Sequence, residues 1–127
     1  MQLDTDVVIR HLTGQPTDQA RRAGEFLATA ERLELPDLIV AEMVYVLQSV
    51  YGRPRREVAV QVRSVLAYPP VRVDNEERSL RALELYEVGH VDFADAYLAA
   101  RAEVSDGRVA SFDRGLDRIE TVAHVEP

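Results

Sequence analysis

Short apolar segments alternate along this chain with longer segments of helical periodicity, and this alternation constrains the fold more than any other feature. The apolar segments are too short for helices and are bounded by glycine, proline or polar residues, as strands commonly are. Strands that are separated by helices pair in parallel, with helices covering both faces of the sheet. We therefore expect an α/β fold with a short, mainly parallel sheet. The expected strands are residues 1–4, 33–35, 71–73, 108–111 and 121–125.

Helix boundaries are marked by residues that start or stop helices. Proline fits the beginning of a helix, and asparagine or aspartate can cap it. Glycine adopts the left-handed conformation that often follows a helix. Starts are expected at Pro16, Pro36, Pro54, Asn75 and Asp92, and ends near Gly14, Gly52 and Gly89, with a last helical turn at residues 114–118. At 127 residues the chain has the size of one domain, so we expect residues 1–127 to form a single domain.

Four carboxylates stand among apolar or small residues instead of in charged stretches. Each is expected to be partly buried, and burying an ionised carboxylate is unfavourable unless it is paired, hydrogen-bonded or bound to a metal. One divalent cation would explain all four, because Mg2+ prefers carboxylates, water and substrate phosphate oxygens. Two of the four also follow expected strands, where sites form in parallel sheets. Asp4, Glu42, Asp95 and Asp113 therefore predict a metal-dependent enzyme that acts on phosphate esters.

Residue usage narrows the chemistry. The chain has no cysteine, which excludes disulfides, thiolate metal sites and a cysteine nucleophile. All 15 basic residues are arginine, so reactions that need a lysine are disfavoured. The net charge of −7 argues against passive adhesion to nucleic acid, although a bound cation would supply the positive charge that meets a phosphate. The sequence shows no leader-like start and no apolar run of membrane-spanning length, so we expect a cytoplasmic protein.

Four motifs occur in a particular order along the chain. They are Leu3-Asp4-Thr5-Asp6-Val7-Val8-Ile9, Ala41-Glu42-Met43, Asp92-Phe93-Ala94-Asp95-Ala96 and Ser111-Phe112-Asp113-Arg114. In this order and at these separations they resemble the PIN-domain ribonucleases of the VapC toxin type, over nearly the whole chain. The resemblance implies a three-layer α/β/α fold, dependence on Mg2+ or Mn2+, and endonucleolytic cleavage of RNA. It also implies a toxin that is restrained by a small antitoxin protein, and a homodimer.

The resemblance also implies a catalytic role for the four acids. By position, Asp4, Glu42, Asp95 and Asp113 match the acidic quartet of the family. Three of them, Asp4, Asp95 and Asp113, are the expected metal ligands. Glu42 either binds the metal or orients the attacking water as a base. Water is then the nucleophile, and one product carries a 5′-phosphate.

Other positions are expected to support these acids. Thr5 and Ser111 match small hydroxyl positions that help to hold the acids and the water, although each also fits a cap or turn hydroxyl. Asp6 stands where asparagine or serine is more usual, and it adds a negative charge beside the metal ligands. Asp92 is either a helix cap or a further supporting carboxylate. Gly115 stands where many relatives carry another acid.

Two other functions stay open at this point. Asp4-Thr5-Asp6 after a first strand also resembles the haloacid-dehalogenase phosphatases, but these need a lysine, which the chain lacks. The second alternative is a catalytically silent PIN-like module for protein interaction, and the four intact acids count against it. Elsewhere, Arg53, Arg55 and Arg56 are interpreted as a solvated helix start, and the dispersed His11, His90 and His124 as surface or polar-edge residues.

Overall fold

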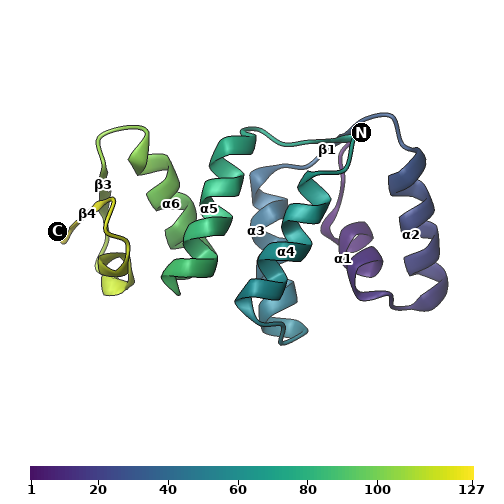
Figure 1. The fold of residues 1–127 in the computed structure, drawn as a ribbon, viewed down its shortest axis with the longest axis horizontal. Helices are drawn as coiled ribbons and strands as arrows, with labels where there is room; N and C mark the ends of the chain where they lie inside the picture. The colour runs from purple at the N-terminus through teal and green to yellow at the C-terminus, as the bar shows by residue number, and fades with distance from the viewer. The chain divides into compact units, whose positions relative to one another are not determined.

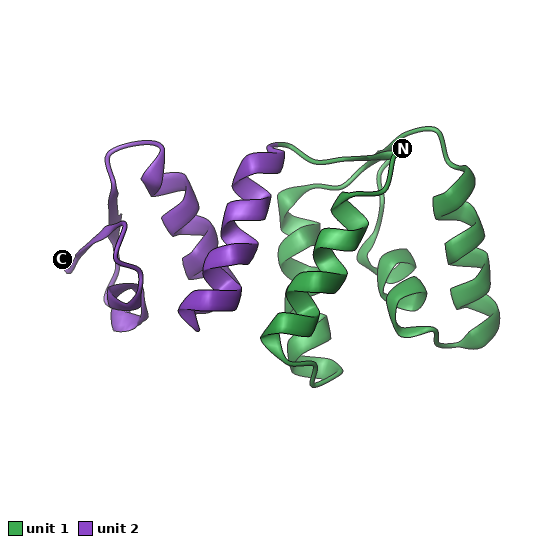
Figure 2. Ribbon diagram, viewed as in Figure 1, with its two compact units in different colours: residues 1–74 green, residues 75–127 purple.

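The structure is a computed structural model that describes residues 1–127 (Figure 1). It divides into two compact units, which are coloured separately in Figure 2. We call residues 1–74 unit 1 and residues 75–127 unit 2. Each unit contains its own pair of parallel strands with helices packed beside it, so the expected alternation of strands and helices is found in both. That residues 1–127 form a single domain stays a prediction.

Unit 1 contains four α-helices, one π-helical turn and two short strands. In chain order these are α1 (Thr5–Thr13), α2 (Thr17–Thr29), β1 (Leu33–Glu34), α3 (Asp37–Tyr45), the π-helical turn η1 (Val46–Val50), α4 (Arg55–Leu66) and β2 (Val71–Arg72). Helix α1 packs against α2 and α3, and α3 packs against α4. The core of unit 1 consists of side chains from these helices, from η1 and from β1. It includes Val8, Leu27, Leu33, Val40, Met43, Val44, Leu47, Val58 and Val62.

The sheet of unit 1 is parallel, with β1 pairing Leu33 to Val71 of β2. On the other side of β1, Gln2 forms a single parallel bridge to Glu34. The prediction of a strand over residues 1–4 is therefore wrong in its length, because only Gln2 forms a bridge. The chain turns into α1 at once, because the Asp4 side chain accepts the backbone N–H of Thr5 and caps the helix there.

The expected helix boundaries of unit 1 are confirmed. Gly14 has a φ of 73° and follows α1, which is the left-handed conformation that glycine adopts without a Cβ clash. Pro16, Pro36 and Pro54 occupy the N-cap positions of α2, α3 and α4. The helix expected to start at Pro36 and to end near Gly52 does so, but its last turn widens into the π-helical turn η1 before Gly52, which has a φ of 64°.

Unit 2 contains two helices, a 3-10 turn and two strands. They are α5 (Glu76–Gly89), α6 (Phe93–Glu103), β3 (Arg108–Ala110), the 3-10 turn η2 (Arg114–Arg118) and β4 (Ala123–Val125). The side chain of Asn75 accepts the backbone N–H of Arg78 and caps α5 as expected. Strands β3 and β4 pair in parallel, with Val109 opposite His124.

The packing of α5 on α6 organises unit 2. Tyr86 of α5 is fully buried and meets the ring of Phe93 edge-on, with ring centroids 6.2 Å apart. Arg81 donates two hydrogen bonds of 2.8 Å each to the carboxylate of Glu103, one from Nε and one from Nη2. Together these contacts fix the two helices, and so fix the position of the first turn of α6, which carries Asp95.

No helix in the structure has both the length and the apolar character that crossing a membrane requires.

Candidate active site

Unit 2 brings two of the predicted acids together. Asp95 lies in the first turn of α6, and Asp113 is the N-cap of η2. A Cβ atom built on Gly115 would lie 3.2 Å from Oδ1 of Asp113 and 3.5 Å from Oδ2 of Asp95. The two carboxylates therefore converge on the small space beside Gly115. Because Gly115 has no side chain, that space is left open.

The surroundings of Asp95 and Asp113 disfavour the state in which both carboxylates are ionised. Burial raises the pKa of Asp95, and the neighbouring charges of Asp113 and then Asp92 raise this pKa further. The Asp95 carboxylate has no hydrogen-bond partner in the protein. An ionised Asp95 is thus destabilised in this structure, and a cation bound between Asp95 and Asp113 would relieve both the desolvation and the repulsion.

The Asp113 carboxylate, in contrast, is held in place by the backbone. Oδ1 of Asp113 accepts the backbone N–H of Gly115 at 2.8 Å. The backbone N–H of Asp113 donates to Oγ of Ser111 at 2.9 Å. Ser111 therefore supports Asp113 in this structure. The hydroxyl does so by fixing the backbone and not by reaching the carboxylate.

The other two predicted acids belong to unit 1. Asp4 caps α1, with Oδ1 accepting the N–H of Thr5 at 2.9 Å. Glu42 lies on α3, the helix that packs against α1. Neither carboxylate forms an ion pair, so both are available to a ligand. The structure thus divides the predicted quartet into two pairs, one in each unit.

The expectation that all four acids are partly buried is wrong for three of them. Asp95 is partly buried, whereas Asp4, Glu42 and Asp113 are exposed. Asp4 and Asp113 are helix caps, which satisfy backbone N–H groups while remaining in contact with water. Glu42 is exposed because Val40 and Val44 occupy the core-facing side of α3, and a residue two positions from each lies on the opposite side.

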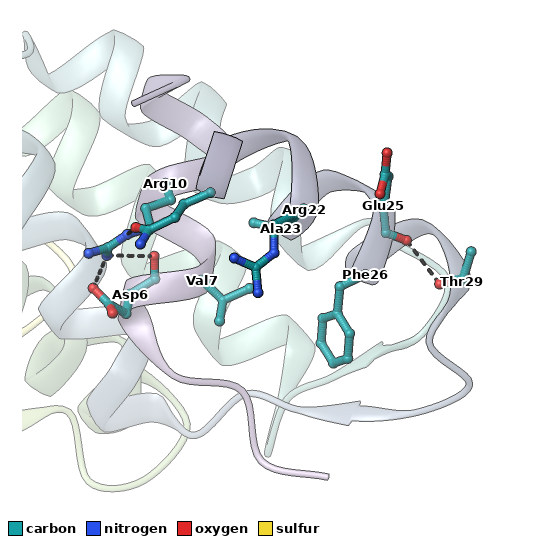
Figure 3. Close-up of a pocket in the computed structure, with 9 residues that line it drawn as sticks. Asp6, Val7, Arg10, Arg22, Ala23, Glu25, Phe26 and Thr29 are labelled. Atoms are coloured by element: carbon teal, nitrogen blue, oxygen red, sulfur yellow. Dashed lines mark hydrogen bonds and ion pairs between the residues drawn. The ribbon is translucent and has the colours of Figure 1, made fainter. Parts of the chain in front are cut away.

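The supporting residues take different positions. The side chain of Asp6 is 65% exposed and forms an ion pair with Arg10, one turn later in α1 (Figure 3). Asp6 also lines a pocket between α1 and α2, together with Arg22 and Phe26. Its charge is therefore partly neutralised by Arg10, which lessens the extra negative charge that the sequence suggested.

Asp92 and Thr5 differ from simple caps. Asp92 occupies the N-cap position of α6, but its side chain accepts no hydrogen bond from that helix. Its charge instead raises the pKa of Asp95. Thr5 is buried, and its Oγ1 has no hydrogen-bond partner, while its backbone N–H holds Asp4. Thr5 is thus an unsatisfied hydroxyl immediately beside one of the predicted ligands.

One residue beside the site was missed by the sequence analysis. His124 was expected at the surface or a polar edge, yet its side chain is only 8% exposed and contacts both Asp117 and the carbonyl of Ser111. Its partners are 7 and 13 residues away in the sequence, so no local motif could have indicated it. In the basic cluster, Arg53 is less solvated than expected, since its side chain is 23% exposed and pairs with Glu57 one turn later.

The donors present suit a hard cation. Carboxylate oxygens are the preferred ligands of Mg2+ and Mn2+, and the space beside Gly115 offers two of them. No group of three or more histidine, aspartate or glutamate side chains lies close enough together to hold a metal ion. Asp95 and Asp113 therefore suit a divalent cation chemically, and they would supply two of its ligands.

The family model for the PIN domain matches residues 1–122. The chain belongs to the PIN domain family. The match extends over both units and includes all four predicted acids, which confirms the expected three-layer α/β/α fold class with a short parallel sheet. PIN domains are generally nucleases and typically bind divalent metals, so the chain is, in broad terms, a metal-dependent nuclease and a hydrolase. A search of curated proteins finds no significant match.

Proposed function

We propose that this PIN domain is an endoribonuclease that hydrolyses RNA phosphodiester bonds with the help of Mg2+ or Mn2+, and that it is the toxin of a toxin–antitoxin pair. One observation carries the proposal. Asp95 and Asp113 converge beside Gly115, and Asp95 has a raised pKa and no hydrogen-bond partner in the protein. Two carboxylates in this arrangement, in a chain of a nuclease family, are best explained by a shared divalent cation.

The proposed ligands are Asp4, Asp95 and Asp113, and the cation they share is Mg2+ or Mn2+. A bound divalent cation would contribute positive charge to the scissile phosphate and lower the pKa of the attacking water. Glu42 either completes the ligand set or accepts a proton from that water. Both roles require an accessible carboxylate that forms no ion pair. Glu42 on α3 is exposed and forms no ion pair.

The remaining residues hold these acids in place. The N–H of Gly115 and the hydroxyl of Ser111 fix the Asp113 segment, and the N–H of Thr5 fixes Asp4. Such supports keep ligand oxygens at positions from which they bind without rearrangement. Because water is the nucleophile, no side chain needs to form a covalent bond with RNA, and the cleaved product carries a 5′-phosphate.

The choice of RNA and the toxin role are supported by the motifs around the acids. The segments that contain Asp4, Glu42, Asp95 and Asp113 resemble the VapC-type toxins in order and separation. We propose on this basis that the partners are an RNA substrate, a cognate antitoxin protein that covers the acids, and a second copy of the chain in a homodimer.

The test is cleavage of a total-RNA mixture by the purified chain with Mg2+, with Mn2+ and with EDTA. We expect discrete fragments with 5′-phosphates in the presence of either metal and no fragments with EDTA. The Asp95→Asn variant should lose cleavage, since it removes one of the converging charges. The matched control is Asp106→Asn in the same unit, because Asp106 is paired with Arg108 instead of with Asp95 and Asp113.

Two results would contradict the proposal. One is cleavage that persists in EDTA, which would remove the metal from the reaction. The other is a folded chain, freed of any bound antitoxin, that neither cleaves RNA nor is stabilised against thermal unfolding by Mg2+ or Mn2+. That second result would favour the protein-interaction module.

A further inference from the structure

His124 on β4 reaches two acceptors that lie on opposite sides of Asp113 in the sequence. Its Nε2 lies 2.6 Å from the carbonyl oxygen of Ser111, directly after β3. Its Nδ1 lies 2.9 Å from Oδ1 of Asp117, within η2. One imidazole therefore connects the start of the Asp113 segment to the turn that follows it.

Both partners of His124 are hydrogen-bond acceptors. A carbonyl oxygen and an ionised carboxylate cannot donate, and a neutral imidazole carries only one N–H. Only the imidazolium can donate to Ser111 and to Asp117 at the same time. In agreement, the Ser111 carbonyl and then the Asp117 carboxylate raise the pKa of His124, against a smaller opposing effect of burial.

The charged groups around His124 come from η2 and from the chain after β4. Asp117 of η2 is also paired with Arg114, whose Nε lies 3.4 Å from Oδ2. Glu126 contributes a further favourable charge from the residues after β4. The contact from the β3 side, the carbonyl of Ser111, is uncharged. The surroundings are thus net negative toward the imidazole, which favours its charged form.

Ser111 is the point through which this contact reaches Asp113. The N–H of Ser111 donates to the carbonyl of Val125, and its carbonyl accepts from His124. Its Oγ accepts the N–H of Asp113. Ser111 is therefore held by β4 on two sides, and Asp113 is held by Ser111. Loss of the His124 contact would remove one of the two hydrogen bonds by which β4 holds Ser111, and so would loosen the backbone that leads to Asp113.

We propose that His124 is a positioning residue, whose imidazolium ties Ser111 to Asp117 and thereby holds the Asp113 carboxylate in its ligand position. This inference rests on the proposed function, in which Asp113 binds the divalent cation. His124 does not contact the cation or the RNA in this account. It acts through the backbone of the Asp113 segment, as residues that support metal ligands do in other proteins.

The test compares wild type with His124→Gln, which keeps one hydrogen-bond donor but cannot become charged, and with Asp117→Asn, which removes the carboxylate partner. The first readout is a metal-free NMR titration. We expect the backbone amides of Phe112 and Asp113 to shift at the same pH at which the His124 ring titrates. That shift should be absent in His124→Gln, and the His124 pKa should fall in Asp117→Asn.

The second readout is the apparent dissociation constant for Mn2+, expressed as the ratio of variant to wild type so that other titrating groups cancel. At a pH below the His124 pKa we expect His124→Gln to bind about tenfold more weakly, at the low end of effects from residues that support ligands. The ratio should approach one as the pH rises above that pKa, because wild-type His124 then also lacks its charge. The control is His11→Gln in unit 1, where His11 contacts Tyr68 and the ratio should stay near one.

The outcomes separate this inference from the proposed function. Amides of Phe112 and Asp113 that do not follow the His124 titration, or a Mn2+ affinity of His124→Gln equal to wild type at every pH, would overturn the positioning role. Coupled titration and weaker Mn2+ binding in a chain that cleaves no RNA would support the positioning role and contradict the nuclease. Circular dichroism of both variants establishes that they fold.

Discussion

The substitution Gly115→Ala places a methyl group next to both of the converging carboxylates. Its Cβ would lie 3.2 Å from Oδ1 of Asp113 and 3.5 Å from Oδ2 of Asp95. Mg2+ binds oxygen ligands at about 2.0–2.1 Å and usually keeps several water molecules. A methyl group in contact with both ligand oxygens takes the place of such water and cannot coordinate.

The expected effects on folding and on metal binding differ in size. Gly115 has no positive φ, so alanine fits its backbone, and replacing glycine there stabilises by about 0.4–1 kcal/mol through the unfolded chain. The 3.2 Å contact requires Asp113 Oδ1 to move by a few tenths of an ångström, which offsets part of this gain. We expect a net change in unfolding free energy of less than about 1 kcal/mol. Metal affinity should fall about tenfold or more, equivalent to about 1.4 kcal/mol.

The assay is isothermal titration with Mn2+, alongside urea unfolding in EDTA. The matched control is Gly89→Ala, since a Cβ at Gly89 would make only ordinary contacts, 3.9 Å from Ile119 and from Val91. This control should bind Mn2+ as wild type does. Wild-type affinity in a folded Gly115→Ala variant would refute the assignment of the space beside Gly115 to the cation.

Three further predictions concern unit 2. Because the pKa of Asp95 is raised in the folded chain, its ionised form destabilises the native state above the unfolded pKa of about 3.9. Urea unfolding in EDTA should therefore show Asp95→Asn to be more stable than wild type at pH 7, with the gain disappearing as the pH falls below 3.9; equal stability at pH 7 would contradict this. Leu116→Ala should lower the unfolding free energy by about 2–5 kcal/mol, because Leu116 is fully buried, and a loss below about 1 kcal/mol by urea unfolding would show that Leu116 is not a core residue. Arg81→Met should lower it by about 1–2 kcal/mol, since it removes two hydrogen bonds to a Glu103 carboxylate that is only 16% exposed. The pKa of Glu103 is lowered, so the Arg81 contribution should be present at pH 7 and be lost as the pH falls through the folded pKa, which urea unfolding at several pH values will check.

Helix boundaries could be predicted from the sequence because the interactions that make them are local. Asn75 caps α5 through a backbone N–H three residues away, and Gly14 ends α1 through its own backbone conformation. The π-helical turn Val46–Val50 could not be predicted, because nothing in its residues distinguishes it from the regular helix before it. The strand expected over residues 1–4 is shorter in the structure, where only Gln2 forms a bridge. The length was wrongly predicted because two local signals overlap there, an apolar start and the Asp4 cap.

The sequence indicated which acids belong to the candidate site, but not how exposed they are or what they contact. The four acids were recognised from their apolar neighbours, but such neighbours do not determine which side of a helix faces the core. Glu42 has buried residues immediately after it and is nevertheless exposed. The two contacts of His124 could not be predicted, since both depend on how β3, η2 and β4 pack. Local capping is readable from sequence, and tertiary hydrogen bonds to single side chains are not.

The most direct test of the proposed site is the stoichiometry and affinity of Mn2+ binding to wild type, Asp4→Asn, Asp95→Asn and Asp113→Asn. If these acids share one catalytic cation, wild type will bind Mn2+ saturably, and each substitution will weaken the same site by about 10- to 100-fold and reduce RNA cleavage in parallel. Wild-type Mn2+ affinity in Asp4→Asn would show that Asp4 is not a ligand of the cation bound by Asp95 and Asp113. The absence of any saturable Mn2+ binding by the folded wild-type chain would contradict the account as a whole.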